Sequence, residues 1–245
     1  MKPQTIVVVG GGVMGAQIAQ VFAAHGHTVR IHDLTWERLT AARDRIVDGR
    51  FGLRSAVARG KLTEPESLAA QERISYVVDL AEACEGADLV QEAVPEDMGL
   101  KVRVFRELDR LSPAGAVLVS NTAGLSVAAL AYATDRPGRV FGWHWFQPCA
   151  VMRCAELVVH DSVDPDALKL VTEVAEGCGR RVVAVNDQPL AWGFVANRIN
   201  ATVRREAEAI VSEGVATRAQ VDQIMRDALR WPMGPFEMSG TDSLG

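Results

Sequence analysis

The sequence predicts an α/β fold, with a doubly wound and mostly parallel sheet followed by an all-helical C-terminal part. First, short apolar runs alternate with helical patterns as far as Asn186, as in parallel sheets whose strands are joined by helices. Second, a glycine-rich turn directly follows the first apolar run. Third, only helical patterns follow Asn186. We therefore expect two domains, formed by residues 1–187 and 188–245.

The first domain is expected to contain strands at regular intervals. The expected strands are residues 5–9, 29–32, 74–77, 89–94, 116–121, 140–143, 157–160 and 182–185. Helical patterns lie between them. Of the clearest three, one ends near Ala24 and the other two cover residues 101–111 and 166–177. A charged stretch over residues 35–60 also reads as helix, although it is unusually long for the connection between two neighbouring strands.

The second domain is predicted from a helical period. Beyond Gly193, apolar residues recur every four positions on one face of an expected helix; they are Val195, Ile199, Val203, Ala207 and Val211. Thr217 is a typical N-cap for a second helix that runs through Leu229, and a third element begins at the segment WPMGPFEM. The chain ends at Gly245 without a closing helix, so we expect this helical domain to be incomplete.

Composition argues against several classes of function. The formal net charge is −5 and the isoelectric point is about 5.6, so the chain lacks the basic character of proteins that bind nucleic acid or anionic membranes. The cysteines form no C-x-x-C pair, which favours free thiols in a reducing compartment and argues against a zinc site. No apolar run approaches the length of a membrane span or a signal sequence. We expect a soluble, cytoplasmic protein.

The glycine-rich turn predicts a dinucleotide-binding site. Its first glycine, Gly10, permits the tight turn out of the strand, whereas Gly12 lets the backbone approach a pyrophosphate and Gly15 lets helix and strand pack closely. The unpaired N–H groups at the start of the helix favour an anion there. The expected pyrophosphate site is therefore the motif Gly10-Gly11-Gly12-Val13-Met14-Gly15.

The second expected strand ends in Asp33. An acid at this place accepts hydrogen bonds from the ribose hydroxyls of the adenosine and repels a 2′-phosphate. A strand, a glycine turn, a helix and this acid, in that order, are typical of a Rossmann-like domain and favour NAD over NADP.

A histidine and a glutamate form a candidate acid–base pair. Glu156 follows His144 by twelve residues, with a Gln-Pro turn between two strand-like runs. A chain that folds back there can bring the carboxylate to one imidazole nitrogen, so that the other takes a proton from a substrate. The spacing alone is equally compatible with a structural histidine and a surface glutamate. Beside a nicotinamide cofactor, the pair suggests an alcohol dehydrogenase.

Longer motifs extend this interpretation to nearly the whole chain. They are, in order, GGGVMGAQIAQVFAAHGHTV, QEAVPEDMGLK, SNTAGLSV, HWFQPCAVMRCAELV, GFVANRI and WPMGPFEM. This ordered set resembles the L-3-hydroxyacyl-CoA dehydrogenases of fatty acid metabolism, including the 3-hydroxybutyryl-CoA dehydrogenases. The resemblance implies an NAD-binding Rossmann-like domain, a helical domain for substrate binding and dimerisation, and a homodimer. It also implies reversible oxidation of an L-3-hydroxyacyl-CoA to the 3-ketoacyl-CoA.

The same motifs imply roles for individual residues. His144 matches the family's catalytic base, and Glu156 matches the carboxylate that orients the imidazole and stabilises the imidazolium. Asn197 matches an asparagine near the substrate oxygen, where it would donate a hydrogen bond to the developing alkoxide. Without the resemblance, Asn197 is equally well interpreted as a helix cap.

Further matches fall on the cofactor site. Glu96 and Lys101 match residues that line its nicotinamide end, and Asn121 is assigned to the same site. For Lys101, a solvated position on a helix is the alternative. Ser120-Asn121-Thr122-Ala123-Gly124 stands where most members of the family have SNTSS, so the serine that contacts the substrate oxygen falls on Ala123. Losing such a donor costs about 1–3 kcal/mol, unless Ser120 or Thr122 replaces it.

Two further features of the sequence concern the binding of the acyl-CoA. Extra residues at Leu190-Ala191-Trp192, together with Trp143 and Trp145, imply either a reshaped acyl pocket or core packing. Basic residues suit either the phosphates of CoA or a solvated helix face; they are Arg50, Arg54, Arg59 and Lys61. Three alternative functions are considered: an NAD-binding pseudoenzyme, a 3-hydroxyacid dehydrogenase that acts on a substrate other than a CoA ester, and a β-hydroxyacid dehydrogenase of the 6-phosphogluconate type. The last would use a lysine base where this chain has Asn197 and Arg198, which argues against it.

Overall fold

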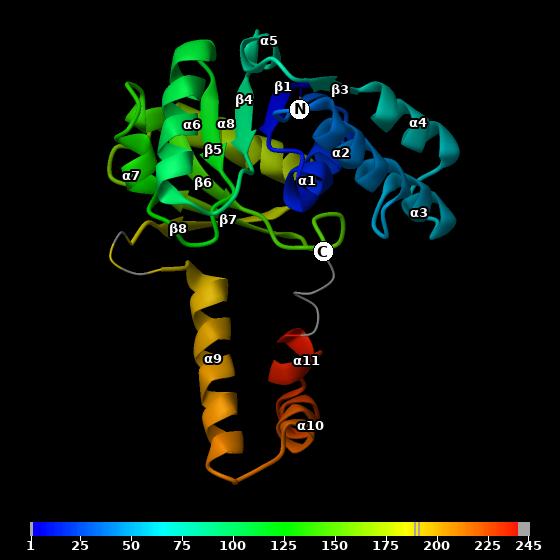
Figure 1. The fold of residues 1–245 in the computed structure, drawn as a ribbon, viewed down its shortest axis with the longest axis vertical. Helices are drawn as coiled ribbons and strands as arrows, with labels where there is room; N and C mark the ends of the chain where they lie inside the picture. The colour runs from blue at the N-terminus through cyan, green and yellow to red at the C-terminus, as the bar shows by residue number, and fades with distance from the viewer. Residues whose placement is uncertain (1, 189, 191, 240–245) are drawn as a thin grey trace. The chain divides into compact units, whose positions relative to one another are not determined.

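The alternating strands and helices between Thr5 and Asn186 form one eight-stranded sheet with helices packed against it (Figure 1). The structure, a computed structural model, describes residues 2–188, 190 and 192–239. It divides into the units Met1–Ala191 and Trp192–Gly245. This division lies near the boundary expected between residues 187 and 188.

The sheet of the first unit has the strand order β3-β2-β1-β4-β5-β6-β7-β8. Its strands are β1 (Thr5–Val9), β2 (Thr28–His32), β3 (Ile74–Val77), β4 (Leu89–Glu92), β5 (Val117–Ser120), β6 (Val140–His144), β7 (Cys154–Val159) and β8 (Arg181–Asn186). Strands β1 to β6 are parallel, β7 is antiparallel to β6, and β8 is parallel to β7. Every strand overlaps with a run expected from the sequence, which confirms the doubly wound, mostly parallel α/β fold.

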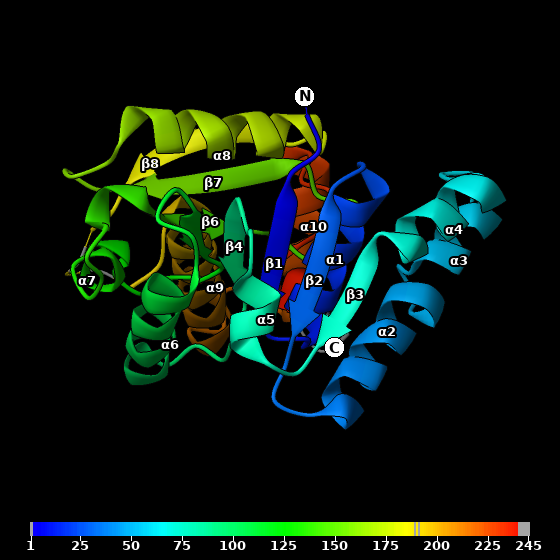
Figure 2. The same cartoon turned by 90° about the horizontal axis from the view of Figure 1, so that it is seen from above.

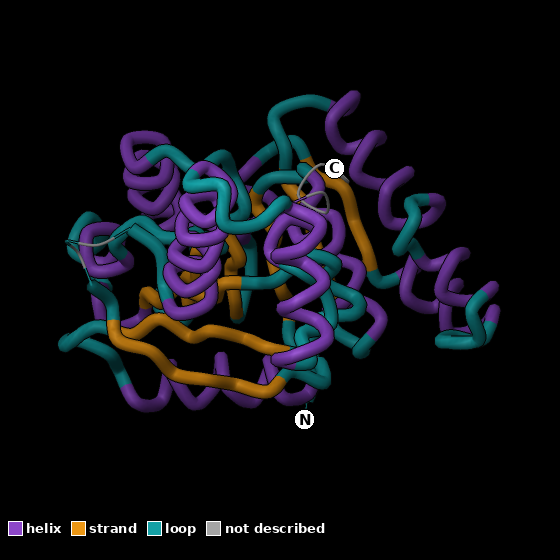
Figure 3. The backbone as a smooth tube through the Cα atoms, turned by 90° about the horizontal axis from the view of Figure 1, so that it is seen from below, coloured by secondary structure: helices purple, strands orange, loops and turns teal. Residues whose placement is uncertain are grey.

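Helices cover both faces of this sheet (Figures 2 and 3). The helices of the first unit are α1 (Val13–Ala24), α2 (Trp36–Asp48), α3 (Leu53–Ala58), α4 (Glu64–Glu72), α5 (Leu80–Cys84), α6 (Met98–Leu111), α7 (Val127–Ala131) and α8 (Pro165–Gly177), of which α3 and α4 extend beyond the β3 edge of the sheet (Figure 2). Ile6 and Val8 of β1 pack in one core with residues of α1, α2 and α8, whereas Val7 and Val9 pack in a second core with α5, α6 and α7. Because alternate side chains of β1 enter different cores, its continuous apolar sequence suits a central strand.

The stretch expected to be one long helix over residues 35–60 is broken. Helix α2 ends at Asp48 and α3 begins at Leu53, with Gly52 as the N-cap of α3. A Cβ added at Gly52 would lie 2.9 Å from the backbone carbonyl oxygens of Ile46 and Val47. The backbone therefore folds back on the end of α2, so the helical stretch predicted over residues 35–60 consists of two helices.

The two tryptophans beside His144 belong to the core. Trp143 and Trp145 are 0% and 3% exposed, and their rings stack with centroids 4.7 Å apart. The Phe22 ring of α1 meets both edge-on. This packing answers the question left open by the sequence in favour of a core role for Trp143 and Trp145. The side chain of Trp192 is exposed, whereas Ala191 lies outside the described residues.

The second unit contains α9 (Val195–Ser212), α10 (Arg218–Leu229) and α11 (Pro235–Ser239). Thr217 caps α10 as expected, and Gln220 completes a capping box with it. The apolar face expected on α9 is partly open to solvent, because Val195 and Ile199 are exposed whereas Ala207 is buried. No helix in the described part of the chain is long and apolar enough to cross a membrane.

Candidate active site

The glycine turn joins β1 to α1 and has the close packing that its sequence requires. Gly10 has a φ of 105°, and a Cβ there would lie 2.7 Å from the carbonyl oxygen of Ala93. A Cβ on Gly15 would lie 1.8 Å from the carbonyl oxygen of Gly10, so α1 can approach the turn only with glycine at this position. At Gly12, the N-cap of α1, an added Cβ would meet no atom within 4 Å. The backbone at the start of α1 is therefore accessible to a pyrophosphate, as the dinucleotide motif requires.

Asp33 lies next to this turn at the end of β2. Its Oδ2 accepts a hydrogen bond from the backbone N–H of Gly11 at 2.8 Å, and its Oδ1 accepts one from Leu34 at 2.7 Å. The exposed guanidinium of Arg38 is 3.5 Å from Oδ1. The turn and the acid are thus joined in one structure, and this donor and acceptor set fits the pyrophosphate and the ribose of NAD.

His144 and Glu156 are direct partners across an antiparallel strand pair. His144 ends β6, Glu156 lies in β7, and the register of the two strands places them opposite each other. The imidazole Nδ1 is 2.7 Å from Glu156 Oε2, and the two side chains are 7% and 5% exposed. The Phe146 ring packs against the imidazole with centroids 4.5 Å apart. The spacing of twelve residues therefore corresponds to a hairpin-like pairing that holds the carboxylate on one ring nitrogen.

Asn121 connects the end of β5 to the residue that follows His144. Its backbone N–H donates to the carbonyl oxygen of Glu92 at 2.8 Å, and its side-chain Oδ1 accepts from the backbone N–H of Trp145 at 2.9 Å. A displacement of Asn121 would therefore be transmitted to the end of β6. Asn197 lies in the first turn of α9, in the second unit.

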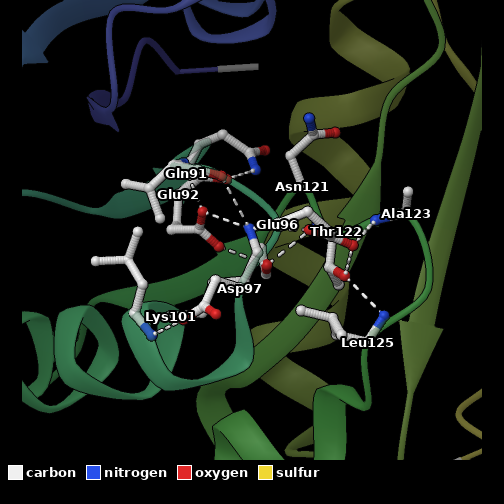
Figure 4. Close-up of polar contacts among 12 residues, drawn as sticks. Gln91, Glu92, Glu96, Asp97, Lys101, Asn121, Thr122, Ala123 and Leu125 are labelled. Atoms are coloured by element: carbon white, nitrogen blue, oxygen red, sulfur yellow. Dashed lines mark hydrogen bonds and ion pairs between the residues drawn. The ribbon is translucent and has the colours of Figure 1, made fainter.

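Lys101 and Glu96 belong to one polar network near β4, α6 and β5 (Figure 4), in which Lys101 is buried whereas the side chain of Glu96 is 34% exposed. The side chain of Lys101 is 1% exposed, which excludes the solvated position considered from the sequence. Its Nζ is 2.7 Å from Glu92 Oε1 and 3.3 Å from Glu96 Oε2. Burial raises the pKa of Glu92, and the neighbouring Lys101 ammonium opposes that rise.

Glu92 was missed by sequence reasoning. It is completely buried in β4, and its carboxylate accepts hydrogen bonds from Lys101, from the Ser120 hydroxyl and from the backbone N–H of Val94. The available signal was a glutamate at the end of an apolar run, in the same QEAVPEDMGLK segment as Lys101. A charged residue at the end of a strand is ordinarily exposed, so the pattern alone did not single it out.

The hydroxyls near Ala123 are already engaged. Ser120 donates to Glu92 Oε2 at 2.6 Å, and Thr122 donates to Glu96 Oε1 at 2.6 Å. Thr122 Oγ1 also accepts from the backbone N–H groups of Gly124 and Leu125. Each hydroxyl has given its one proton to a carboxylate, so neither replaces a serine hydroxyl at position 123.

Other candidate groups have structural partners or low reactivity. Arg54 forms an ion pair with Asp48, and the guanidinium groups of Arg50 and Arg59 lie 5.4 and 5.6 Å from the Phe51 ring centroid. Burial raises the pKa of Cys149 to about 12, which disfavours its thiolate. Among the described residues, no group of histidine, cysteine and acidic side chains could hold a metal ion.

Comparison with known proteins identifies the family. Residues 5–188 match the 3-hydroxyacyl-CoA dehydrogenase, NAD binding domain, and residues 193–245 match the 3-hydroxyacyl-CoA dehydrogenase, C-terminal domain. The chain belongs to the 3-hydroxyacyl-CoA dehydrogenase family. The resemblance inferred from the motifs is therefore confirmed, together with NAD as the cofactor.

Individual members of the 3-hydroxyacyl-CoA dehydrogenase family show how far the similarity extends. A probable 3-hydroxybutyryl-CoA dehydrogenase of Bacillus subtilis is 37% identical over 98% of this chain and 81% of its own length. A 3-hydroxyadipyl-CoA dehydrogenase of Escherichia coli is 36% identical over 99% of this chain but only 49% of its own length. The crystal structure of FadB2 of Mycobacterium tuberculosis has a TM-score of 0.92 at 36% identity, covering 100% of this chain and 85% of that one.

Membership of the 3-hydroxyacyl-CoA dehydrogenase family decides between the functions considered above. The protein is an NAD-dependent oxidoreductase that interconverts a 3-hydroxyacyl-CoA and a 3-ketoacyl-CoA. The family match and the relatives named as dehydrogenases argue against the 6-phosphogluconate-type enzyme and the pseudoenzyme. The division of roles among individual residues is a separate question.

Proposed function

We propose that His144 is the general base of this oxidation and that Glu156 orients it. The observation that carries the proposal is the buried contact of 2.7 Å between His144 Nδ1 and Glu156 Oε2. With Nδ1 on the carboxylate, Nε2 is the nitrogen that takes the proton of the substrate's C3 hydroxyl. Glu156 then stabilises the imidazolium and keeps the ring from rotating. In the reverse direction, the imidazolium returns the proton to the 3-keto oxygen.

The glycine turn and Asp33 would hold the cofactor. Val13 and Met14 at the N-terminus of α1, with Gly12, would receive the pyrophosphate, and Asp33 would receive the adenosine ribose. Bound NAD supplies the hydride acceptor for the C3 hydrogen of the substrate. Glu96 and Asn121 would position its nicotinamide end.

The oxygen of the substrate needs hydrogen-bond donors while negative charge develops on it. Asn197, at the start of α9, would supply one of them. A methyl group at Ala123 stands where most members of the family place a second donor. We infer that the enzyme works with a less polar oxygen site, at a cost of about 1–3 kcal/mol of transition-state stabilisation.

Oxidation of NADH with acetoacetyl-CoA and with longer 3-ketoacyl-CoA esters tests this assignment. Purified protein should turn over at least one of these substrates. His144→Ala should lower kcat by about two to four orders of magnitude. Its dissociation constant for NADH, measured by fluorescence, should remain within about twofold of the wild-type value. An active His144→Ala variant would contradict the role of His144, whereas wild-type protein that binds NADH but turns over none of the esters would contradict the assigned substrate.

We also infer that the second unit forms a homodimer interface. Large apolar side chains are exposed on its described helices and turns, and exposed apolar surface of this kind marks interaction sites; they are Trp192, Val195, Ile199, Val215, Ile224 and Leu229. Sedimentation equilibrium should give twice the monomer mass, and Ile199→Asp should shift the protein towards the monomer. A monomeric wild-type protein would contradict this inference.

A further inference from the structure

Glu92 is part of a closed ring of polar contacts (Figure 4). Along one route, Glu92 Oε1 accepts from Lys101 Nζ at 2.7 Å, and the same Nζ is 3.3 Å from Glu96 Oε2. Glu96 Oε1 then accepts from the hydroxyl of Thr122 at 2.6 Å. Along the other route, Glu92 Oε2 accepts from Ser120 Oγ at 2.6 Å, and this hydroxyl accepts from the backbone N–H of Thr122 at 3.1 Å. Both routes from Glu92 therefore end on Thr122.

The ammonium group of Lys101 is buried among three oxygen atoms. An ammonium has three N–H groups, and Lys101 Nζ lies near three acceptors: Glu92 Oε1, Glu96 Oε2 and, at 3.2 Å, the carbonyl oxygen of Val94. With its side chain 1% exposed, it is shielded from solvent. The position of Lys101 is thus suited to holding Glu96 rather than to contacting a cofactor.

The ring contacts the turn that begins at Asn121, and this turn connects Glu96 of the proposed cofactor site with the strand that carries His144, the proposed base. Glu96 Oε1 holds Thr122 and also accepts from the backbone N–H of Ala123 at 2.8 Å. The residue before Thr122 is Asn121, whose side chain accepts from the backbone N–H of Trp145, directly after His144. A shift of this turn would therefore move Glu96 and the end of β6 relative to each other.

Stability alone does not explain why a carboxylate is kept at position 92. Taking a carboxylate and an ammonium out of water costs about as much as their attraction returns, and apolar replacement of such a pair is often neutral or stabilising. Structural stability would therefore be served as well by apolar side chains at positions 92 and 101. The ring instead provides directional contacts that set the position of Glu96 and of the turn.

We propose that Glu92 is a positioning residue for this enzyme: through Lys101 and Ser120 it fixes Glu96 and the turn that begins at Asn121. In this proposal, which rests on the proposed function, Lys101 acts on the cofactor site through Glu96. Substitution of Glu92 should therefore impair NADH binding and turnover without removing any group that touches the substrate.

A double-mutant cycle of Glu92→Gln and Glu96→Gln tests the route through Glu96. Glu92→Gln alone should lower kcat/KM by roughly tenfold to a hundredfold, the scale of losses caused by misplaced groups. It should also weaken NADH binding. In the Glu96→Gln background the same change should cost clearly less, about threefold to tenfold through the remaining route by Ser120, because residues that act through one another are not additive. An equal loss in both backgrounds would overturn the proposal.

Two further variants separate positioning from folding. Ser120→Ala keeps every charge of the ring and should fold, yet it should lower kcat/KM by about threefold to tenfold, the value of one hydrogen bond. Glu92→Gln combined with Lys101→Met removes the buried charges together, and it should unfold near the wild-type temperature while kcat/KM stays at least about tenfold low. Activity within about twofold of wild type in either variant would overturn the proposal.

A matched control comes from a second pair of opposite charges on the same unit. Asp109 contacts Arg136 at 2.5 Å, with the two side chains 12% and 15% exposed. Asp109→Asn should lower the unfolding temperature while leaving kcat/KM within about twofold of wild type. If wild-type protein turned over no 3-ketoacyl-CoA, the proposed function would fail. If it were active but insensitive to Glu92→Gln, only the positioning role would fail.

Discussion

Two buried contacts between a carboxylate and a nitrogen base lie on either side of β5, and they differ in what the nitrogen can still do. Both are 2.7 Å long, and all four side chains are at most 7% exposed. The imidazole of His144 contacts Glu156 through Nδ1, and its ring has a second nitrogen, Nε2, that can act as a base. The ammonium of Lys101, held by Glu92, also donates to the carbonyl oxygen of Val94 and forms an ion pair with Glu96.

This difference shows that a short, buried contact does not by itself identify a reacting pair. Distance and burial are alike in the two contacts. What separates them is the chemistry of the nitrogen, since an imidazole has a second ring nitrogen that can accept a proton, whereas an ammonium has no lone pair and can only donate to the groups around it. Three changes can break or sharpen the comparison.

The largest effect is expected from Glu156→Gln. An amide keeps the shape of the side chain but can neither stabilise the imidazolium nor select the required tautomer of His144. The kcat for acetoacetyl-CoA reduction should fall by about three to four orders of magnitude, as for the carboxylate of hydrolase triads. Stopped-flow turnover measures this loss, and Glu173→Gln on the exposed face of α8 is the control. A loss below about tenfold would assign Glu156 a structural role only.

Lys101→Met should affect stability more than any single change at the surface. It leaves Glu92 buried without its cation, which costs about 3–5 kcal/mol of unfolding free energy. Urea denaturation measures the cost, and Lys169→Met, which alters an exposed ion pair of α8, is the control. A change below about 1 kcal/mol would show that Glu92 needs no cation.

The same variant has a predicted pH dependence. Burial raises the pKa of Glu92, and Lys101 opposes that rise, so without Lys101 the folded-state pKa lies further above the unfolded value. An acid with a raised folded-state pKa binds protons more tightly when folded, so stability falls as pH rises above the unfolded pKa of about 4.3. The stability deficit of Lys101→Met should therefore be smaller at about pH 5 than at about pH 8. A deficit that grows on acidification would contradict this assignment.

The smallest effect is expected from Ala123→Ser. The backbone N–H of residue 123 is held by Glu96, so the ring already fixes the place from which a serine hydroxyl would extend. The kcat/KM should stay equal or rise by up to about tenfold, the value of one added hydrogen bond to the substrate oxygen. Steady-state kinetics with acetoacetyl-CoA measures it. A clear loss would mean that this turn does not face the substrate.

The site shows which of its features could be predicted from the sequence and which could not. The glycine motif and Asp33 were predictable because each glycine answers a local steric demand, such as the approach of α1 to the turn at Gly15. The contact between His144 and Glu156 was predictable because a short connection between two strands allows few registers. Glu92 was not predictable, because its burial depends on α6 and β5 covering it and not on its neighbours in the chain.

By itself, the sequence determined the alternating strands and helices, the NAD-binding turn and the family, because apolar periodicity and glycine spacing act over short stretches of chain. Only the tertiary structure decided that the segment after β2 breaks at Gly52, that Trp143 and Trp145 fill the core, and that Lys101 is buried against Glu92. The break at Gly52 depends on the backbone packing against the end of α2, whereas the burial of the two tryptophans and of Lys101 depends on helices that pack against the sheet. A buried charge also takes its properties from the groups that surround it in space.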